Sequence, residues 1–183
     1  MTELLERLTQ DHRHRSRLLN LFDGLLDRFH EGNEPDFELM CEMLEYMESY
    51  ADQVHHPSEE VIFDRLRART NETYPVLDVL TKQHVLLGQM NKRFRQSLDG
   101  IVHEEVLRRD DVEVQGREFV KTMWEHLKLE EAEAFPLARE RLSDSDWVEL
   151  LDEVPSIDDP VFGDADPARF RTLFQHLMSQ AQP

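Results

Sequence analysis

The sequence predicts an all-α protein, an up-down-up-down four-helix bundle followed by a C-terminal helical extension. Apolar residues recur three and four positions apart over four long stretches, which is the spacing of one face of an α-helix. No stretch alternates between apolar and polar residues as a half-buried strand would, and the chain contains only six glycines. Because the connections between the four stretches are short, neighbouring helices are expected to run antiparallel.

Two apolar stripes predict the first two helices. The first stripe is followed by a helix-breaking segment at 32–35 and the second by one at 71–75. The first stripe consists of Leu5, Leu8, Leu19, Phe22, Leu26 and Phe29. The second stripe consists of Phe37, Met40, Leu44, Met47, Ala51, Ile62 and Leu66. Each stripe is long enough for a helix that crosses the whole bundle.

The last two helices of the bundle follow from two further stripes. The third stripe consists of Leu77, Leu80, Leu87, Phe94 and Leu98. The fourth stripe consists of Phe119, Met123, Ala134 and Leu137. The bundle is therefore expected to span residues 1–142. Residues 143–183 are the extension, whose short helices pack either on the bundle or on a second subunit or partner protein.

Charge and cysteine content exclude several classes of protein. Lysine and arginine number 21 against 39 aspartates and glutamates, which gives a formal net charge of −18. This excess of negative charge argues against binding to nucleic acid or to an anionic membrane surface. No apolar run is long enough to span a bilayer. The single cysteine, Cys41, excludes a disulfide framework and favours a reducing compartment, so a cytoplasmic protein is expected.

The chain repeats itself, with residues 1–70 matching 73–142. The segment from Leu8 to His12 matches the segment from Leu80 to His84, and His55 to Glu60 matches His126 to Glu131. The two histidines of a half are 43 residues apart in the first half and 42 in the second. Each half is therefore interpreted as a helical hairpin with one histidine on its first helix and His-x-x-x-Glu on its second.

Six polar residues fall on the apolar faces of the four predicted helices. They are His12, His55, Glu59, His84, His126 and Glu130. Spacing of four places each histidine and glutamate pair on one helix face, so the six are expected to converge inside the bundle. Two buried carboxylates need compensating positive charge, and among lysines and arginines only Arg15 falls near them in phase. A pair of metal cations would supply the missing charge.

The other histidines are expected to have ordinary structural or solvent-exposed roles. They are His14, His30, His56, His103 and His176. His56 and Glu60 fall in phase with Ser49, Gln53 and Arg67 on the mostly polar side of their helix. Glu60 and Glu131 are expected to be solvated or to lie behind the ligands. A lone histidine on an apolar face is commonly a hydrogen-bonded core residue, but four in register with two glutamates favour a metal site.

Imidazole and carboxylate ligands suit iron, manganese or zinc, so ligand type alone does not select the metal. Ferritin-like di-iron proteins use Glu-x-x-His, which this chain does not contain. The pattern His12, His55-x-x-x-Glu59, His84 and His126-x-x-x-Glu130 resembles the hemerythrin-like, or HHE cation-binding, family over residues 1–142. The resemblance covers the residue type at six positions, the helical phase of these positions and the duplication.

The resemblance implies two iron ions joined by an oxo or hydroxo bridge, in preference to manganese or zinc. One iron would be held by His12 and His55 and the other by His84 and His126, with Glu59 and Glu130 bridging them. Open coordination positions would take dioxygen, nitric oxide or another small ligand. Oxygen-carrying members of the family have an extra histidine one turn after the one matching His84, where this chain has Gly88. They also place an aspartate five residues after the last histidine, where this chain has Glu130 at four.

Two functions are weighed on this basis, and a third is kept open. The first is a binding protein that binds or senses dioxygen, nitric oxide or iron. The alternative is a di-iron oxidoreductase acting on peroxide, nitric oxide or ferrous iron, although no in-phase tyrosine or cysteine is placed as an electron relay and no catalytic residue is assigned. The third is a structural or transport site for a metal such as zinc. A sensor would signal through a partner, for which residues 143–183 are the expected surface.

Overall fold

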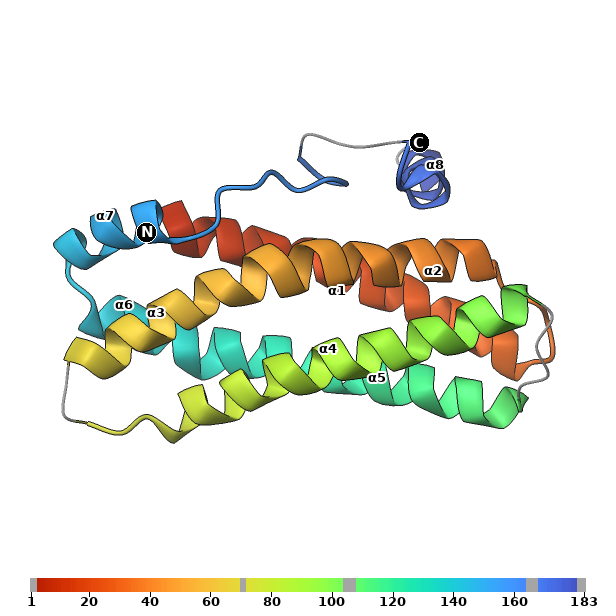
Figure 1. Cartoon of the computed structure of the whole chain (residues 1–183), viewed down its shortest axis with the longest axis horizontal. Helices are drawn as coiled ribbons and strands as arrows, with labels where there is room; N and C mark the ends of the chain where they lie inside the picture. The colour runs from red at the N-terminus through yellow and green to blue at the C-terminus, as the bar shows by residue number, and fades with distance from the viewer. Residues whose placement is uncertain (1–2, 70–71, 104–107, 164–167, 181–183) are drawn as a thin grey trace.

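A computed structural model describes residues 3–69, 72–103, 108–163 and 168–180 and shows an all-helical protein, with no strand in these ranges (Figure 1). The first long stretch is helix α1 (Glu3–His30). The second comprises α2 (Phe37–Tyr46), the π-helix η1 (Met47–His55) and α3 (His56–Arg69). The third is α4 (Pro75–Val102), and the fourth comprises α5 (Arg109–Leu129), the π-helix η2 (Glu130–Ala134) and α6 (Phe135–Arg141). Within the described ranges, no helix is long and apolar enough to cross a membrane.

The four stretches lie side by side, and α5 packs against both α1 and α4 while α2 packs against α4 (Figure 1). Local sequence explains their ends. Gly32 follows α1 with a φ of 89°, a left-handed conformation that glycine adopts without steric cost. The Asp36 side chain accepts a hydrogen bond of 2.9 Å from the Leu39 amide and so caps α2. Pro75 begins α4, where its missing N–H costs nothing.

The apolar stripes form two separate hydrophobic clusters. One contains Phe22, Phe94 and Phe119, and the other contains Leu5, Ile62 and Leu80. Five of the six histidine and glutamate positions of the repeat fall between the two clusters along the chain, and His126 lies at the end of the first cluster, next to Leu127. The polar centre is thus enclosed by apolar packing at both ends, which keeps it away from bulk water.

Close helix packing in the first cluster requires a glycine at position 116. A Cβ atom on Gly116 would lie 2.7 Å from Leu26 Cδ2 and 2.8 Å from Phe94 Cζ. Both distances are shorter than carbon atoms tolerate, so no larger residue fits without displacing its neighbours. Gly24 in α1, by contrast, has no atom within 4 Å of its Cβ position.

Each π-helix ends two residues before a proline. The His56 N–H bonds to the Ala51 carbonyl just before Pro57, and the Phe135 N–H bonds to the Glu130 carbonyl just before Pro136. Both bonds span five residues instead of four. Proline has no N–H to donate and its ring crowds the carbonyl four residues earlier, which favours this wider turn. The wider turn rotates the side chains that follow it relative to an α-helix.

The described parts of the C-terminal region contact the helices of the same chain. Helix α7 (Asp144–Glu153) begins with a capping box between Ser143 and Asp146 and buries Trp147 in the second cluster. Helix α8 (Arg171–Gln180) lies next to α2 and is seen end-on in Figure 1. Its Leu173 amide donates a 2.8 Å hydrogen bond to Glu42.

Candidate metal centre

The structure brings the six residues expected at the metal site together, from four helical stretches of the chain. His12 lies on α1, His84 on α4 and His126 on α5. His55 ends η1, Glu59 lies in the first turn of α3, and Glu130 begins η2. His84 is nearly buried and the other five are fully buried, with both glutamates at 0 % exposure. Their burial follows from the apolar residues on either side of them in each stripe.

The two oxygen atoms of each glutamate face different histidine pairs. Glu59 Oε1 lies 2.9 Å from His55 Nε2 and 3.5 Å from His12 Nε2, whereas its Oε2 lies 3.4 Å from His84 Nε2. Glu130 Oε2 lies 3.3 Å from His12 Nε2, whereas its Oε1 lies 3.3 Å from His84 Nε2 and 3.2 Å from His126 Nε2. Each glutamate thus has one oxygen beside the His12 and His55 pair and the other beside the His84 and His126 pair, which would allow it to bridge two cations.

The opposite ring nitrogen of each histidine has a separate partner. His12 Nδ1 contacts Glu131 at 3.1 Å and His84 Nδ1 contacts Glu60 at 2.6 Å. Glu131 and Glu60 follow the two central glutamates directly and so occupy equivalent places in the repeat. Because a carboxylate accepts a hydrogen bond from Nδ1–H, it leaves the Nε2 lone pair free to bind a metal.

The remaining two histidines are held by the residues that precede His12 and His84. His55 Nδ1 lies 2.8 Å from Asp11 Oδ2, and His126 Nδ1 lies 3.1 Å from Gln83 Oε1. These partners are again equivalent in the repeat, although one is a carboxylate and the other an amide. All four histidines therefore present Nε2 to the centre and Nδ1 to a hydrogen-bond acceptor.

His84 Nε2 and Glu130 Oε1 are hydrogen-bonded to each other at 3.3 Å, but six other atoms at the centre lack hydrogen-bond partners among the described residues. They are His12 Nε2, His55 Nε2, His126 Nε2, both oxygens of Glu59 and Glu130 Oε2. Arg15 is also buried, at 1 % exposure, but both of its terminal nitrogens lack an acceptor within the described ranges. It therefore does not pair with either glutamate. Buried carboxylates without such a partner are costly, and bound cations would satisfy them.

Without metal, protonated histidines balance the two carboxylates. Burial alone would lower the pKa of His84, but contacts with Glu130, Glu59 and Glu60 outweigh it and raise that pKa to about 11. The pKa of His12 is shifted in the same way: burial would lower it, but contacts with Glu130, Glu131 and Glu59 raise it well above 6.5. Burial dominates at His126 and lowers its pKa to about 4. Burial would raise the pKa of Glu59, but His55, His12 and His84 lower it well below 4.5.

His56 does not lie on a polar helix face, contrary to the sequence expectation. It is only 4 % exposed, and its ring stacks on His84 with centroids 4.3 Å apart. The expectation assumed an unbroken α-helix through residues 47–55. Because this segment is a π-helix, the 100° step per residue fails there, and both His55 and His56 turn inward. Pro57 after two histidines was the signal in the sequence that a phase change was due.

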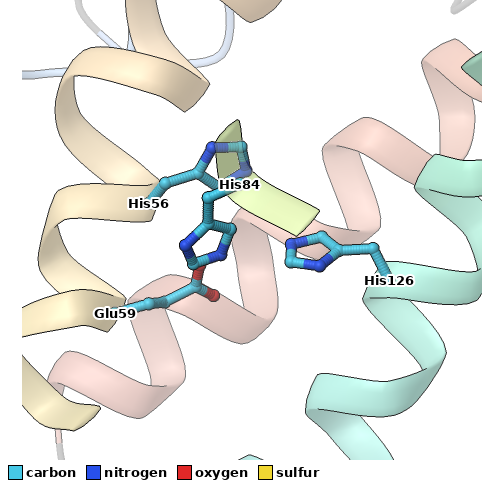
Figure 2. A group of neighbouring side chains, drawn as sticks. All are labelled: His56, Glu59, His84 and His126. Atoms are coloured by element: carbon cyan, nitrogen blue, oxygen red, sulfur yellow. The ribbon is translucent and has the colours of Figure 1, made fainter. Parts of the chain in front are cut away.

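Figure 2 shows His56 and Glu59 on α3, with His84 and His126 approaching from α4 and α5. His56, Glu59, His84 and His126 each offer a ligand atom, and these atoms lie within 4.8 Å of one another. Burial, reinforced by His84 and Arg15, lowers the pKa of His56 well below 6.5. A pocket of about 630 Å³ opens beside the rings of His56 and His84 and extends to Gly88.

A second group of possible ligands lies next to the centre. Asp11, His14 and Asp159 approach one another, with His14 Nδ1 3.7 Å from Asp159 Oδ2. Asp159 already accepts a 2.7 Å hydrogen bond from the Tyr46 hydroxyl and bonds from the amides of Val161 and Phe162. These contacts fasten the segment after α7 onto α1 and α2, which gives His14 a structural role.

Comparison with known proteins agrees with this geometry. The sequence model of one protein family, described as the hemerythrin HHE cation binding domain, matches residues 3–138. No curated protein and no solved structure matches the chain.

Proposed function

Since the chain belongs to the hemerythrin HHE cation-binding family, we propose that its buried centre holds two iron ions in an up-down-up-down four-helix bundle formed by residues 1–142. His12 and His55 would bind one ion, and His84 and His126 the other. Glu59 and Glu130 would bridge them, together with an oxo or hydroxo group. The observation that carries this proposal is that the two oxygens of each glutamate face opposite histidine pairs.

Bound iron would supply redox chemistry and open coordination positions for dioxygen or nitric oxide. The chain's own residues perform three tasks around it. The Nδ1 partners hold each imidazole in the tautomer that binds through Nε2. The two glutamates provide negative charge that favours cations over neutral ligands. The two hydrophobic clusters exclude water from the ends of the centre.

We propose that the protein binds or senses a small ligand such as dioxygen, nitric oxide or iron itself. Iron, manganese and zinc all accept histidine and carboxylate ligands, so the choice of iron rests on the family and is tested by the spectrum described below. The pocket beside His56 and His84 brings solvent to the His84 side of the centre. The alternative, turnover of peroxide, nitric oxide or ferrous iron, is separated from binding by the experiment that follows.

The test is to load the protein anaerobically with ferrous iron and to record its visible spectrum before and after admitting oxygen. A charge-transfer band that appears with oxygen and disappears when oxygen is removed supports reversible binding. Irreversible conversion to an oxo-bridged ferric spectrum, with oxygen consumed, supports the oxidoreductase or the sensing of iron over reversible oxygen binding. Absence of any iron-dependent spectrum overturns the di-iron proposal.

The iron content of two matched variants tests the assignment of Glu130. Glu130→Gln should lower the iron bound per chain, because it replaces a bridging carboxylate by an amide. Glu133→Gln makes the same chemical change three residues later in η2, at an exposed position, and should load as the unmodified protein does. Equal iron content in both variants would contradict the assignment of Glu130.

A further inference from the structure

The side chain of His56 is oriented as the four expected histidine ligands are. Its Nδ1 lies 3.2 Å from Asp52 Oδ1, one turn earlier in the chain. Its Nε2 is buried and has no hydrogen-bond partner among the described residues. Every histidine at the centre therefore has Nδ1 against an acceptor, which leaves Nε2 as the atom available to a metal. A buried imidazole nitrogen without a partner is costly unless something binds it.

The free nitrogen of His56 lies on the side of the centre that belongs to His84 and His126. Its ring stacks on His84 and stands at 88° to His126, with ring centroids 5.5 Å apart (Figure 2). The ligand atoms of these three histidines and Glu59 lie within 4.8 Å of one another. Opposite ligands of a metal ion bound at about 2.1 Å lie ~4 Å apart, so these atoms need only a small approach to share one ion. Because the ion must lie in the plane of each imidazole that binds it, one of the two stacked rings has to turn when the metal binds.

Gly88 makes room for the group that holds His56. A Cβ atom at position 88 would lie 3.4 Å from Asp52 Oδ2, in ordinary van der Waals contact with that carboxylate. Asp52 thus occupies the space beside α4 that a larger residue at position 88 would fill. From there it reaches His56 Nδ1 and fixes the ring with Nε2 inward.

From these contacts we propose that His56 is a fifth histidine ligand and binds the metal ion held by His84 and His126. This inference rests on the proposed two-metal site and makes its two ions unequal. One ion has three histidine ligands and the other has two, His12 and His55. The two carboxylates and a third bridging group would occupy three positions on each ion. The ion with three histidines would then have six ligands, and the ion beside His12 and His55 would have five and keep one position open. Asp52 is the positioning residue for His56.

The test is proton NMR of the protein loaded with cobalt(II) alone. A histidine bound through Nε2 gives one strongly shifted Nδ1–H resonance, which disappears in deuterium oxide as that proton exchanges. The inference predicts five such resonances, from His12, His55, His56, His84 and His126. His56→Leu should leave four and weaken one of two cobalt-binding steps by about tenfold or more. His30→Gln, at an exposed histidine far from the centre, should leave five.

The possible outcomes separate this inference from the proposed function. Four resonances in the unmodified protein would overturn the role of His56 and leave the two-metal site intact, without need of any variant. Five resonances that persist in His56→Leu would also overturn it. No shifted resonance in the unmodified protein, with no cobalt bound, would overturn the metal site itself. Asp52→Asn should keep five resonances but shift the one that disappears in His56→Leu.

Discussion

Asp11 lies directly before His12 in sequence, yet its carboxylate contacts His55 Nδ1 at 2.8 Å. The same turn of α1 therefore carries one histidine of the pair and holds the ring of the other. The carboxylate orients the His55 ring and increases the electron density on its Nε2. In the second half of the repeat, Gln83 makes the corresponding contact to His126 at 3.1 Å as a neutral amide. The two halves therefore hold His55 and His126 by equivalent contacts, one from a charged carboxylate and the other from a neutral amide.

Asp11→Asn should weaken metal binding about 10- to 100-fold while leaving the fold intact, because the amide lacks the charge that supports the imidazole. Titration with cobalt(II) measures this affinity. Asp23→Asn is the matched control: the same change on the same helix, at a residue whose partner is the surface Arg117. Unchanged affinity in Asp11→Asn would show that the contact is only structural.

Metal binding at pH 7 should release about two protons, because the raised pKa values keep His12 and His84 protonated in the metal-free protein. Both protons must leave before Nε2 can bind a cation. Calorimetric titration with zinc in buffers of different ionisation enthalpy gives the number released. Apparent affinity should also rise with pH. A measured release near zero would show that these histidines are neutral before metal arrives.

The metal-free protein should be most stable near pH 6.5, the ordinary pKa of histidine. Above that pH, the stability contributed by protonated His12 and His84 is lost as pH rises toward about 11, the folded pKa of His84. Below pH 6.5, His126 binds a proton in the unfolded protein but stays neutral in the folded protein until about pH 4. Protonation of the unfolded state therefore lowers the free energy of unfolding as the pH falls. Each such group changes the free energy of unfolding by up to about 1.4 kcal/mol per pH unit.

Urea unfolding of the metal-free protein between pH 4 and pH 9 tests this dependence. His84→Gln, which removes one of the two histidines with a raised pKa, should flatten the decline on the alkaline side. A stability that is constant from pH 6.5 to pH 9 would contradict the protonation of His12 and His84.

Gly116→Ala should lower the free energy of unfolding by about 1–3 kcal/mol, because the new methyl group would overlap Leu26 and Phe94. Gly24→Ala is the control, since nothing lies within 4 Å of its Cβ position. There, the same substitution in a helix interior should raise stability by about 0.5–1 kcal/mol. Urea unfolding of both variants measures the difference. Equal effects would mean that α5 does not approach α1 and α4 as closely as described.

Helical spacing in the sequence was sufficient to identify the positions that meet at the centre. His12 and His84 lie on uninterrupted α-helices, where the 3.6-residue period holds from the first apolar residue to the last. His126 lies on α5 before η2 begins, so its phase was also reliable. The repeat identified His55 independently of phase. Which of these residues bind metal remains the proposal made above.

The sequence by itself determined the all-helical class, the family and the set of residues that converge, because helix periodicity and the repeat are local properties of the chain. Only the tertiary structure decided the position of His56 and the partners of each Nδ1. The wider turns of η1 displace His56 from the face that an α-helical period assigns to it. Contacts such as Asp11 with His55 cross between helices, and their distances depend on how the helices pack together.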